Sequence, residues 1–311
     1  MIEVIKTYYF YQTIKRKMEE SQMVNRKSST MSHNEVKKFL KNASMDERID
    51  FILDNPCFLD IMYQENMIDY DFAKRITECT RGFWFSLFYR YLNKDEMIRL
   101  STFACSIDPG LLAEVKYKTR GICEAAVIKN GRALSIVPSE FIDKKMCILA
   151  VSSDPVSIKF VPDKFITDAI TSLAVSLDPE TIKFIPYKYQ SIEDVKKAIK
   201  YNAECFNYIN PAFKIKHHLK LLVLINPDIV QFLDYNNDNK EYFELAVEAD
   251  GTALRFVPET FRTFDICRSA SFAKNGDSAF AYIPKELYYD VLHAKIKRIE
   301  SISGINNNRN D

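Results

Sequence analysis

Six copies of one 24-residue pattern run from Thr119 to Arg262 without insertion or deletion. In register, the copies begin at Thr119, Asp143, Thr167, Ser191, Ile215 and Asn239. A repeat of this length is one small supersecondary unit, which can bury its apolar face only by stacking on neighbouring copies. We therefore expect one elongated domain, although 311 residues alone would suggest about two domains.

The first half of each copy has the apolar spacing of a short amphipathic helix. An apolar pair stands at the eighth and ninth positions, and another apolar residue precedes it at the fourth or fifth position. Residues four apart lie on one helix face, so we predict a helix of about ten residues. The pairs are Ala126-Val127, Ala150-Val151, Ala174-Val175, Ala198-Ile199, Leu222-Val223 and Ala246-Val247.

A dipeptide of turn-forming residues follows the first helix in nearly every copy. Glycine is expected here to adopt the positive φ that ends a helix, while Asp or Asn can cap the next helix and Pro suits its first position. We predict a break between two helices. The dipeptides are Asn130-Gly131, Asp154-Pro155, Asp178-Pro179, Asn202-Ala203, Asn226-Pro227 and Asp250-Gly251.

The second half of each copy carries apolar residues spaced two and then one apart, as in Leu134, Ile136 and Val137. A proline then stops the second helix, since proline cannot continue a helix. The stop prolines are Pro138, Pro162, Pro186 and Pro258, and in the copy at Ser191 the proline comes one residue later, at Pro211. Aromatic residues that should plug the seams between units are Phe141, Phe165, Tyr189, Phe213 and Phe261.

The spacing of Leu134 and Ile136 also resembles a buried strand, so a horseshoe with one parallel strand per copy is a second possible architecture. The Asp-Pro breaks fit a helix start, and the asparagine ladder of leucine-rich repeats is missing. We therefore predict an all-α solenoid of short two-helix repeats. Its predicted segments are an N-terminal helix (1–23), a linker and first helix (24–43), degenerate repeats (44–118), six regular repeats (119–262), a capping repeat (263–300) and a disordered tail (301–311).

Helix starts are also predicted outside the regular copies. Ser32 with Glu35, and Ser44 with Glu47, have the spacing of capping boxes before apolar residues. Looser copies are expected to begin near Asp69 and near Met97. The aromatic and basic segment at 8–17 is interpreted either as a helix that covers one end of the solenoid or as a membrane-surface helix.

The motif A-V-x-x-(N/D)-(G/P)-x-x-(L/I)-x-(F/I)-V-P, found from Ala126 to Pro138, Ala150 to Pro162 and Ala246 to Pro258, resembles a family of short helical repeats of unknown function. That family is common in amoebal giant viruses and in intracellular bacteria. The motif is also similar in length to leucine-rich-variant repeats, which implies an α-helix followed by a 3-10-like helix. The resemblance implies a viral or pathogen protein and supplies no catalytic residue. Asp234 in place of the stop proline and Ala203 at the break depart from the motif.

Composition argues against several functional classes. Lys and Arg number 43 against 42 Asp and Glu, so the chain lacks the basic excess of a dedicated nucleic-acid binder. Seven cysteines without a C-x-x-C pair indicate buried thiols in a reducing compartment. The start lacks the features of a secretory signal, and the apolar run from Phe83 to Leu92 is too short to span a bilayer.

No residue pattern predicts a catalytic, cofactor or metal site. The adjacent His217 and His218 point in different directions on a helix, so we expect one packed and one solvated ring. Cys123, Cys147 and Cys267 share a repeat position that is apolar elsewhere, which favours a core role over a nucleophile.

One set of side chains is predicted to form an interaction surface. They lie between two apolar residues of the second helix, and stacking would place them as a ladder about 10 Å apart. We expect a monomeric, non-enzymatic protein-interaction scaffold that lies in the cytoplasm. If the protein is viral, we expect it in the cytoplasm of the host cell or in the virion. The alternatives are a solvated stripe without a partner, or a nucleic-acid-binding or enzyme-associated module. The ladder consists of Ser135, Lys159, Lys183, Asn207, Gln231 and Arg255.

Overall fold

The computed structural model describes residues 31–234 and 236–302. Every regular element in these residues is an α-helix or a 3-10 helix, and the same residues contain no strand. The predicted all-α fold is confirmed, and the alternative with a strand in each copy is wrong. The predicted helix at 1–23, the linker before residue 31 and the tail from residue 303 lie outside the described residues. Residues 301 and 302 are helical, so the prediction that they belong to a disordered tail is wrong.

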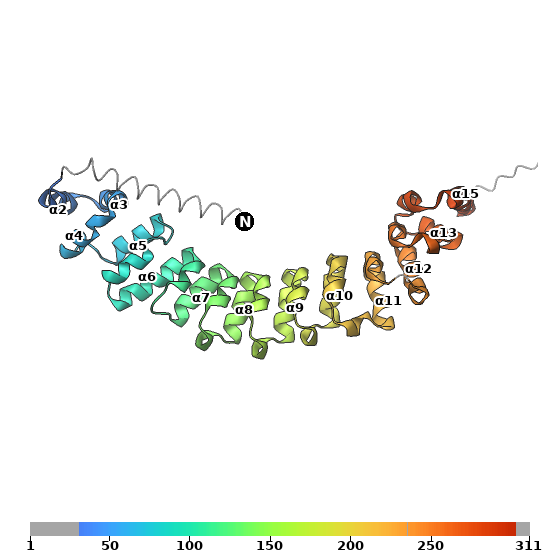
Figure 1. Ribbon diagram of the computed structural model, residues 1–311, viewed down its shortest axis with the longest axis horizontal. Coiled ribbons are helices and arrows are strands. Elements are labelled where there is room, and N and C mark those ends of the chain that lie inside the picture. Colours follow the sequence, from blue (N-terminus) through green and yellow to red (C-terminus); the bar gives the residue numbers. More distant parts are fainter. Residues whose placement is uncertain (1–30, 235, 303–311) are drawn as a thin grey trace, which may run out of the picture. The chain divides into compact units, whose positions relative to one another are not determined.

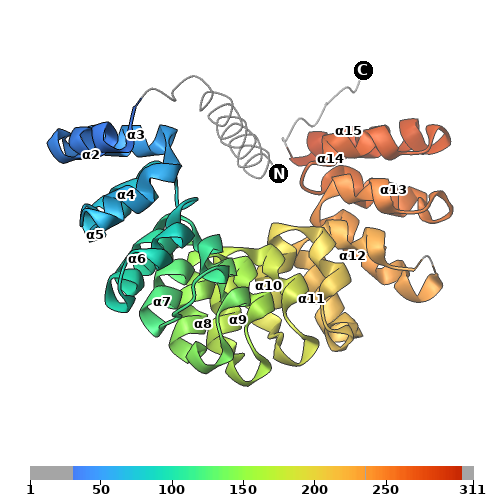
Figure 2. The same ribbon diagram turned by 60° about the vertical axis from the view of Figure 1, so that its left-hand side comes forward.

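The chain divides into two compact units, Met1–Ser153 and Asp154–Asp311. Within each unit, successive helices lie side by side in chain order (Figure 1 and Figure 2). The first unit contains α2 (His33–Asn42), α3 (Met45–Asp54), η1 (Pro56–Phe58), α4 (Leu59–Gln64), α5 (Tyr70–Cys79), η2 (Phe85–Arg90), α6 (Lys94–Ile107), η3 (Pro109–Ala113), α7 (Arg120–Lys129), η4 (Gly131–Ile136), η5 (Ser139–Phe141) and α8 (Lys144–Ser153), where η denotes a 3-10 helix.

The second unit repeats one order of elements and then departs from it at its end. It contains η6 (Pro155–Phe160), η7 (Asp163–Phe165), α9 (Asp168–Leu177), η8 (Pro179–Phe184), η9 (Tyr187–Tyr189), α10 (Ile192–Tyr201), η10 (Ala203–Tyr208), η11 (Pro211–Lys214), α11 (Lys216–Ile225), η12 (Pro227–Phe232), η13 (Asn237–Asn239), α12 (Lys240–Ala249), η14 (Gly251–Phe256), η15 (Glu259–Phe261), α13 (Phe264–Phe272), α14 (Gly276–Ala279), η16 (Phe280–Tyr282) and α15 (Lys285–Ile302).

The apolar pairs of the sequence pattern form the helix contacts. Ala174, Val175, Ala198 and Ile199 are all completely buried between α9, α10 and their neighbours. The small alanine side chain lets neighbouring helices approach closely, and burying each branched side chain contributes about 1.5–3 kcal/mol. The predicted helix face is therefore confirmed.

Helix starts outside the regular copies follow the capping signals. Ser32 and Glu35 form a capping box before α2, and Ser44 and Glu47 form another before α3, as predicted. Where a looser copy is expected near Asp69, the helix α5 begins with Asp69 as its N-cap. Where another is expected near Met97, the helix α6 begins earlier, because Asn93 and Glu96 make a third capping box at its start.

The break between the paired helices is an Asx cap in all six copies. The side-chain oxygen of the Asx residue accepts a hydrogen bond from the backbone N–H two residues later, at the start of the six-residue 3-10 helix. These bonds run to Asn130 (3.0 Å), Asp154 (2.9 Å), Asp178 (3.0 Å), Asn202 (2.9 Å), Asn226 (3.1 Å) and Asp250 (2.9 Å).

The explanation predicted for the break glycines is wrong. Neither Gly131 nor Gly251 has a positive φ, and Gly82 is the one described glycine that does. A Cβ at Gly251 would lie 2.4 Å from the carbonyl oxygen of Ala270 and 3.0 Å from the Cα of Gly276. Glycine is needed at this break because the backbone of the following copy approaches too closely for a side chain.

None of the helices in the described part of the chain has the length and apolar character that a membrane crossing requires.

Candidate interaction surface

The structure places the predicted ladder residues on equivalent turns of successive 3-10 helices. In the second unit these are η6, η8, η10, η12 and η14, each in contact with the next. Lys159, Lys183, Asn207 and Arg255 are exposed, and Gln231 is half-buried. The second unit therefore brings five of the six predicted residues together. Ser135 lies in the first unit, on η4, where it is also exposed.

Each ladder side chain points outward because the two residues before it are buried. Thr181 and Ile182 are completely buried before Lys183, and Ala253 and Leu254 are completely buried before Arg255. A 3-10 helix has three residues per turn, so a buried pair leaves the third residue facing solvent. The same packing that holds each short helix in place therefore sets the direction of its ladder residue.

The positive charges of the ladder are largely balanced by neighbouring carboxylates. The Arg255 guanidinium lies 2.7 Å from the Asp228 carboxylate of the preceding copy, and Lys183 lies 3.2 Å from Glu180. The Gln231 amide donates to the backbone oxygen of Asp228 at 2.9 Å. Two of the three cations of the ladder are thus paired with carboxylates, so the ladder is not a continuous basic groove.

A row of aromatic side chains lies beside the ladder and was not predicted from the sequence. Lys159 Nζ lies 4.8 Å from the centroid of the Phe160 ring and 5.7 Å from that of Phe184 in the next copy. The Arg255 guanidinium lies 4.4 Å from the Phe256 ring. Contacts of this kind contribute about 0.5–1 kcal/mol at exposed sites. The sequence signal was an aromatic residue directly after each of the five ladder positions of the second unit, at Phe160, Phe184, Tyr208, Phe232 and Phe256.

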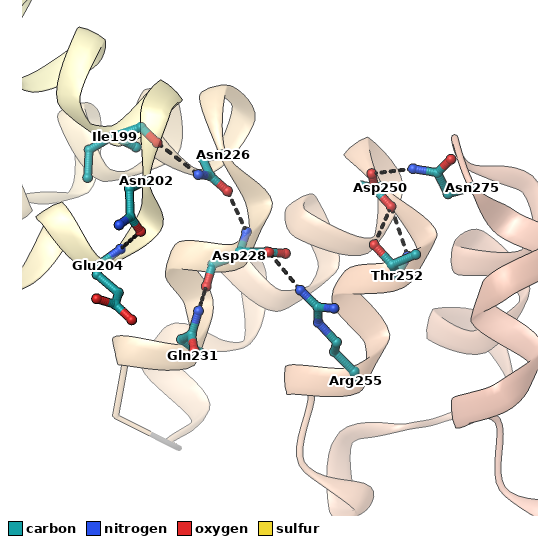
Figure 3. A network of polar contacts seen from close by, with 10 residues as sticks. All are labelled: Ile199, Asn202, Glu204, Asn226, Asp228, Gln231, Asp250, Thr252, Arg255 and Asn275. Carbon is teal, nitrogen blue, oxygen red and sulfur yellow. Dashed lines mark hydrogen bonds and ion pairs between the residues drawn. The ribbon is translucent and has the colours of Figure 1, made fainter. Parts of the chain in front are cut away.

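Polar bonds between neighbouring copies hold the breaks of the second unit in register (Figure 3). The Asn226 side chain caps η12 and also donates through Nδ2 to the carbonyl oxygen of Ile199, at 2.8 Å. Asp250 caps η14 and accepts from Asn275 Nδ2 at 2.7 Å. One Asx side chain thus caps the 3-10 helix of its own copy and binds an adjacent copy, which fixes the spacing of the ladder residues.

A buried glutamine explains why the copy at Ser191 lacks the stop proline at its usual position. Gln190 Nε2 donates to the carbonyl oxygens of Ile185 and Tyr208, each at 3.0 Å, and Gln190 Oε1 accepts from the Asn210 backbone N–H at 2.7 Å. Asn210 occupies the stop-proline position, and proline has no N–H to donate. The departure from the motif is therefore part of a contact between two copies.

The same repeat position carries an equivalent bond at the last regular copy. Arg262, like Gln190, is the twenty-fourth residue of its copy. Its guanidinium donates to the carbonyl oxygen of Val257 at 2.8 Å and to the carbonyl oxygen of Tyr282, in the final copy, at 2.9 Å. A long polar side chain at this position therefore joins two copies through backbone carbonyls.

Five of the seven cysteines are buried in the core, as predicted, whereas Cys57 and Cys79 are exposed, so the prediction is wrong for these two. Cys123, Cys147 and Cys267 are completely buried, so burial confirms their apolar role. Burial raises the pKa of the Cys147 and Cys205 thiols to about 11 and that of the Cys105 thiol to about 12. These thiols stay protonated near neutral pH, which makes them poor nucleophiles.

The two adjacent histidines differ in environment, as predicted. His217 is exposed, whereas His218 is half-buried with its ring 5.6 Å from that of Phe213, one of the predicted aromatic plugs. Phe213 itself is half-buried. Tyr189, another predicted plug, is also half-buried and donates its hydroxyl to the carbonyl oxygen of Asp163 in the preceding copy, at 3.3 Å. These aromatics thus contact neighbouring copies.

A cavity of about 530 Å³ lies between α13, α14 and α15 in the second unit. Its charged groups include Lys295 and Asp277, which are 2.5 Å apart, and the Arg298 guanidinium over the Phe272 ring at 4.3 Å. Lys295 and Asp277 thus bind each other, and Arg298 contacts an aromatic ring. Among residues 31–234 and 236–302, no cluster of three His, Cys, Asp or Glu side chains has a geometry that could hold a metal ion.

Comparison with protein-family models, with curated proteins and with solved structures found no significant match.

Proposed function

We propose that the chain is an α-solenoid of 24-residue units, each an α-helix and a 3-10 helix, and that it acts as a non-enzymatic protein-interaction scaffold. The ten-residue helices α7 to α12 begin 24 residues apart, at residues 120, 144, 168, 192, 216 and 240. This recurrence supports the repeat architecture. Repeat stacks commonly present one extended recognition surface, built from equivalent positions of successive units.

The observation that carries the proposal is the row of ladder side chains on η6 to η14, which are exposed except for the half-buried Gln231. Lys183 and Arg255 of this row form ion pairs with Glu180 and Asp228, so the surface carries both positive and negative groups. Aromatic rings lie beside its cations. Protein interfaces are enriched in aromatic residues and arginine, whereas nucleic-acid surfaces are strongly basic. The row therefore favours a protein partner. The viral or pathogen origin, the monomeric state and the location in the cytoplasm or virion remain predictions.

The ladder proposal is tested by capture of partners from a cell lysate, followed by mass spectrometry. A variant with Lys159→Glu, Lys183→Glu and Arg255→Glu should lose the captured partners. A matched control with Lys240→Glu, Lys274→Glu and Lys285→Glu carries the same charge change on exposed residues outside the ladder and should retain them. The proposal is wrong if both variants capture the same proteins as the unmodified chain, provided that both keep its circular dichroism melt.

A further inference from the structure

A second surface, on the α-helices of the second unit, combines exposed apolar side chains with lysines. The helices α9, α10 and α11 lie side by side, and each contacts the next (Figure 2). The exposed fractions of three large apolar residues in their last turns are 52% for Leu177, 65% for Tyr201 and 55% for Leu224. Together with Lys197, Lys200 and Leu221, these residues are called here the α9–α11 surface.

Polar bonds fix the register of these three helices. Lys197 Nζ lies 3.0 Å from Ser176 Oγ, which joins α10 to α9. The Asn226 side chain donates to the carbonyl oxygen of Ile199, which joins the end of α11 to α10. Leu177 and Tyr201 hold the same position in successive copies, and Leu224 lies one position earlier in the next copy. The apolar side chains of α9 and α11 therefore flank the lysines and tyrosine of α10.

The α9–α11 surface carries a net positive charge. The helix α11 contains two lysines and no acidic residue, and the buried Asp194 of α10 accepts hydrogen bonds from Ser172 and Ser191. Glu193 pairs with Lys196, and Glu241 pairs with the two lysines of α11. Within the described part of the chain, no ion pair joins Lys197 or Lys200 to a carboxylate.

We propose that the α9–α11 surface binds an acidic amphipathic segment of another protein, with carboxylates facing Lys197 and Lys200 and apolar side chains on Leu177, Tyr201 and Leu224. The ammonium groups of Lys197 and Lys200 form no ion pair within the described residues, and they are complementary to carboxylates. The leucines favour a polypeptide, because an apolar helix face is matched by an amphipathic helix and not by a phosphate backbone. This surface is separate from the ladder, which lies on the 3-10 helices.

The test is a titration of the full chain into a labelled synthetic peptide, followed by fluorescence anisotropy. In the peptide, leucines recur three and four residues apart and glutamates fill the flanking positions. The unmodified chain should bind it. Lys197→Gln with Lys200→Gln should weaken the affinity about tenfold or more, and so should Tyr201→Ser with Leu224→Ser, because each pair removes one kind of contact near the centre of the surface.

Two controls separate this site from the ladder and from general charge attraction. The ladder variant and the Lys240→Glu, Lys274→Glu, Lys285→Glu variant should bind the peptide as the unmodified chain does. Polyglutamate and a single-stranded oligonucleotide should bind much more weakly than the peptide. The proposal is overturned if the peptide does not bind, if the two surface variants bind it unchanged, or if polyglutamate or the oligonucleotide binds equally well.

Discussion

Individual residues determine how closely neighbouring copies approach. Gly251 shows this most directly, since its backbone N–H donates to the carbonyl oxygen of Lys274 at 2.8 Å while its Cα lies against the following copy. The glycine at this break is therefore a contact residue and not a turn residue. The sequence shows the glycine but not the backbone packed against it, which is why its role was predicted wrongly.

Gly251→Ala should destabilise the protein, because the new Cβ would lie 2.4 Å from a backbone oxygen that belongs to a packed helix. We expect a loss of about 1–3 kcal/mol in the free energy of unfolding, as for overpacking in a core. The matched control is Gly121→Ala in α7, where a Cβ meets nothing within 4 Å. This control should raise the stability by up to about 1 kcal/mol, through helix propensity. Urea unfolding followed by circular dichroism measures both, and equal effects would contradict the packing argument.

Gln190→Ile should also destabilise the protein, although isoleucine stands at the same position of the preceding copy, as Ile166. The substitution leaves the Asn210 N–H and the Tyr208 carbonyl without their partner. Each buried group that loses its hydrogen bond costs about 1–3 kcal/mol. The control is Gln231→Ala, which removes one bond to the backbone of its own turn and should cost less than 1 kcal/mol. A stability of Gln190→Ile within error of the unmodified chain would refute the proposed role.

Short elements of this fold depend on their caps, because a 3-10 helix of six residues has few hydrogen bonds of its own. All six breaks place an Asx oxygen on the backbone N–H two residues later, as in Asp178 and Asn226. The N-terminal helices use capping boxes for the same purpose. These caps were predictable from the sequence, since they depend on residues two or three positions apart.

The capping boxes should make part of the stability depend on pH. The Ser44 backbone N–H donates to the Glu47 carboxylate at 2.7 Å and, together with the Ser44 hydroxyl, lowers the Glu47 pKa below its ordinary 4.5. A pKa that is lower in the folded state gives stability that is present above pH 4.5 and lost as the pH falls through the folded value. Glu47→Gln keeps the cap without the charge, so it should flatten this acid-induced loss.

Urea unfolding of the unmodified chain and of Glu47→Gln, at neutral pH and at about pH 3.5, measures this effect. The two proteins should differ in stability at neutral pH and converge in acid. A Ser44→Ala control removes the hydroxyl side of the box and should lower stability at both pH values. If Glu47→Gln and the unmodified chain lose the same stability on acidification, the cap does not contribute as described.

At the scale of the whole molecule, the repeat made the helical composition, the buried pairs and the caps predictable. Contacts between copies were less accessible to sequence reasoning. Gln190 with Asn210 joins residues 20 positions apart, and Arg255 with Asp228 joins residues 27 apart. Such pairs depend on which side chains meet after stacking, and the 24-residue period does not specify them. The α9–α11 surface was missed for the same reason, because its members lie on three helices.

The proposed solenoid makes a direct prediction about deletions. If each unit packs against its neighbours through equivalent positions, removal of one whole unit should leave the remaining contacts intact. Deletion of residues 143–166 joins Ile142 to Thr167, so Ile142 takes the position of Ile166 and the register is kept. Deletion of residues 143–154 removes half a unit and places a 3-10 helix where an α-helix should begin.

The most direct measurement is urea unfolding of both deletion variants, followed by far-UV circular dichroism. The solenoid account predicts that the 24-residue deletion retains the helical signal per residue and a cooperative transition, while the 12-residue deletion loses much of both. The account is contradicted if the 24-residue deletion unfolds the chain as fully as the 12-residue deletion, or if the two variants are equally stable.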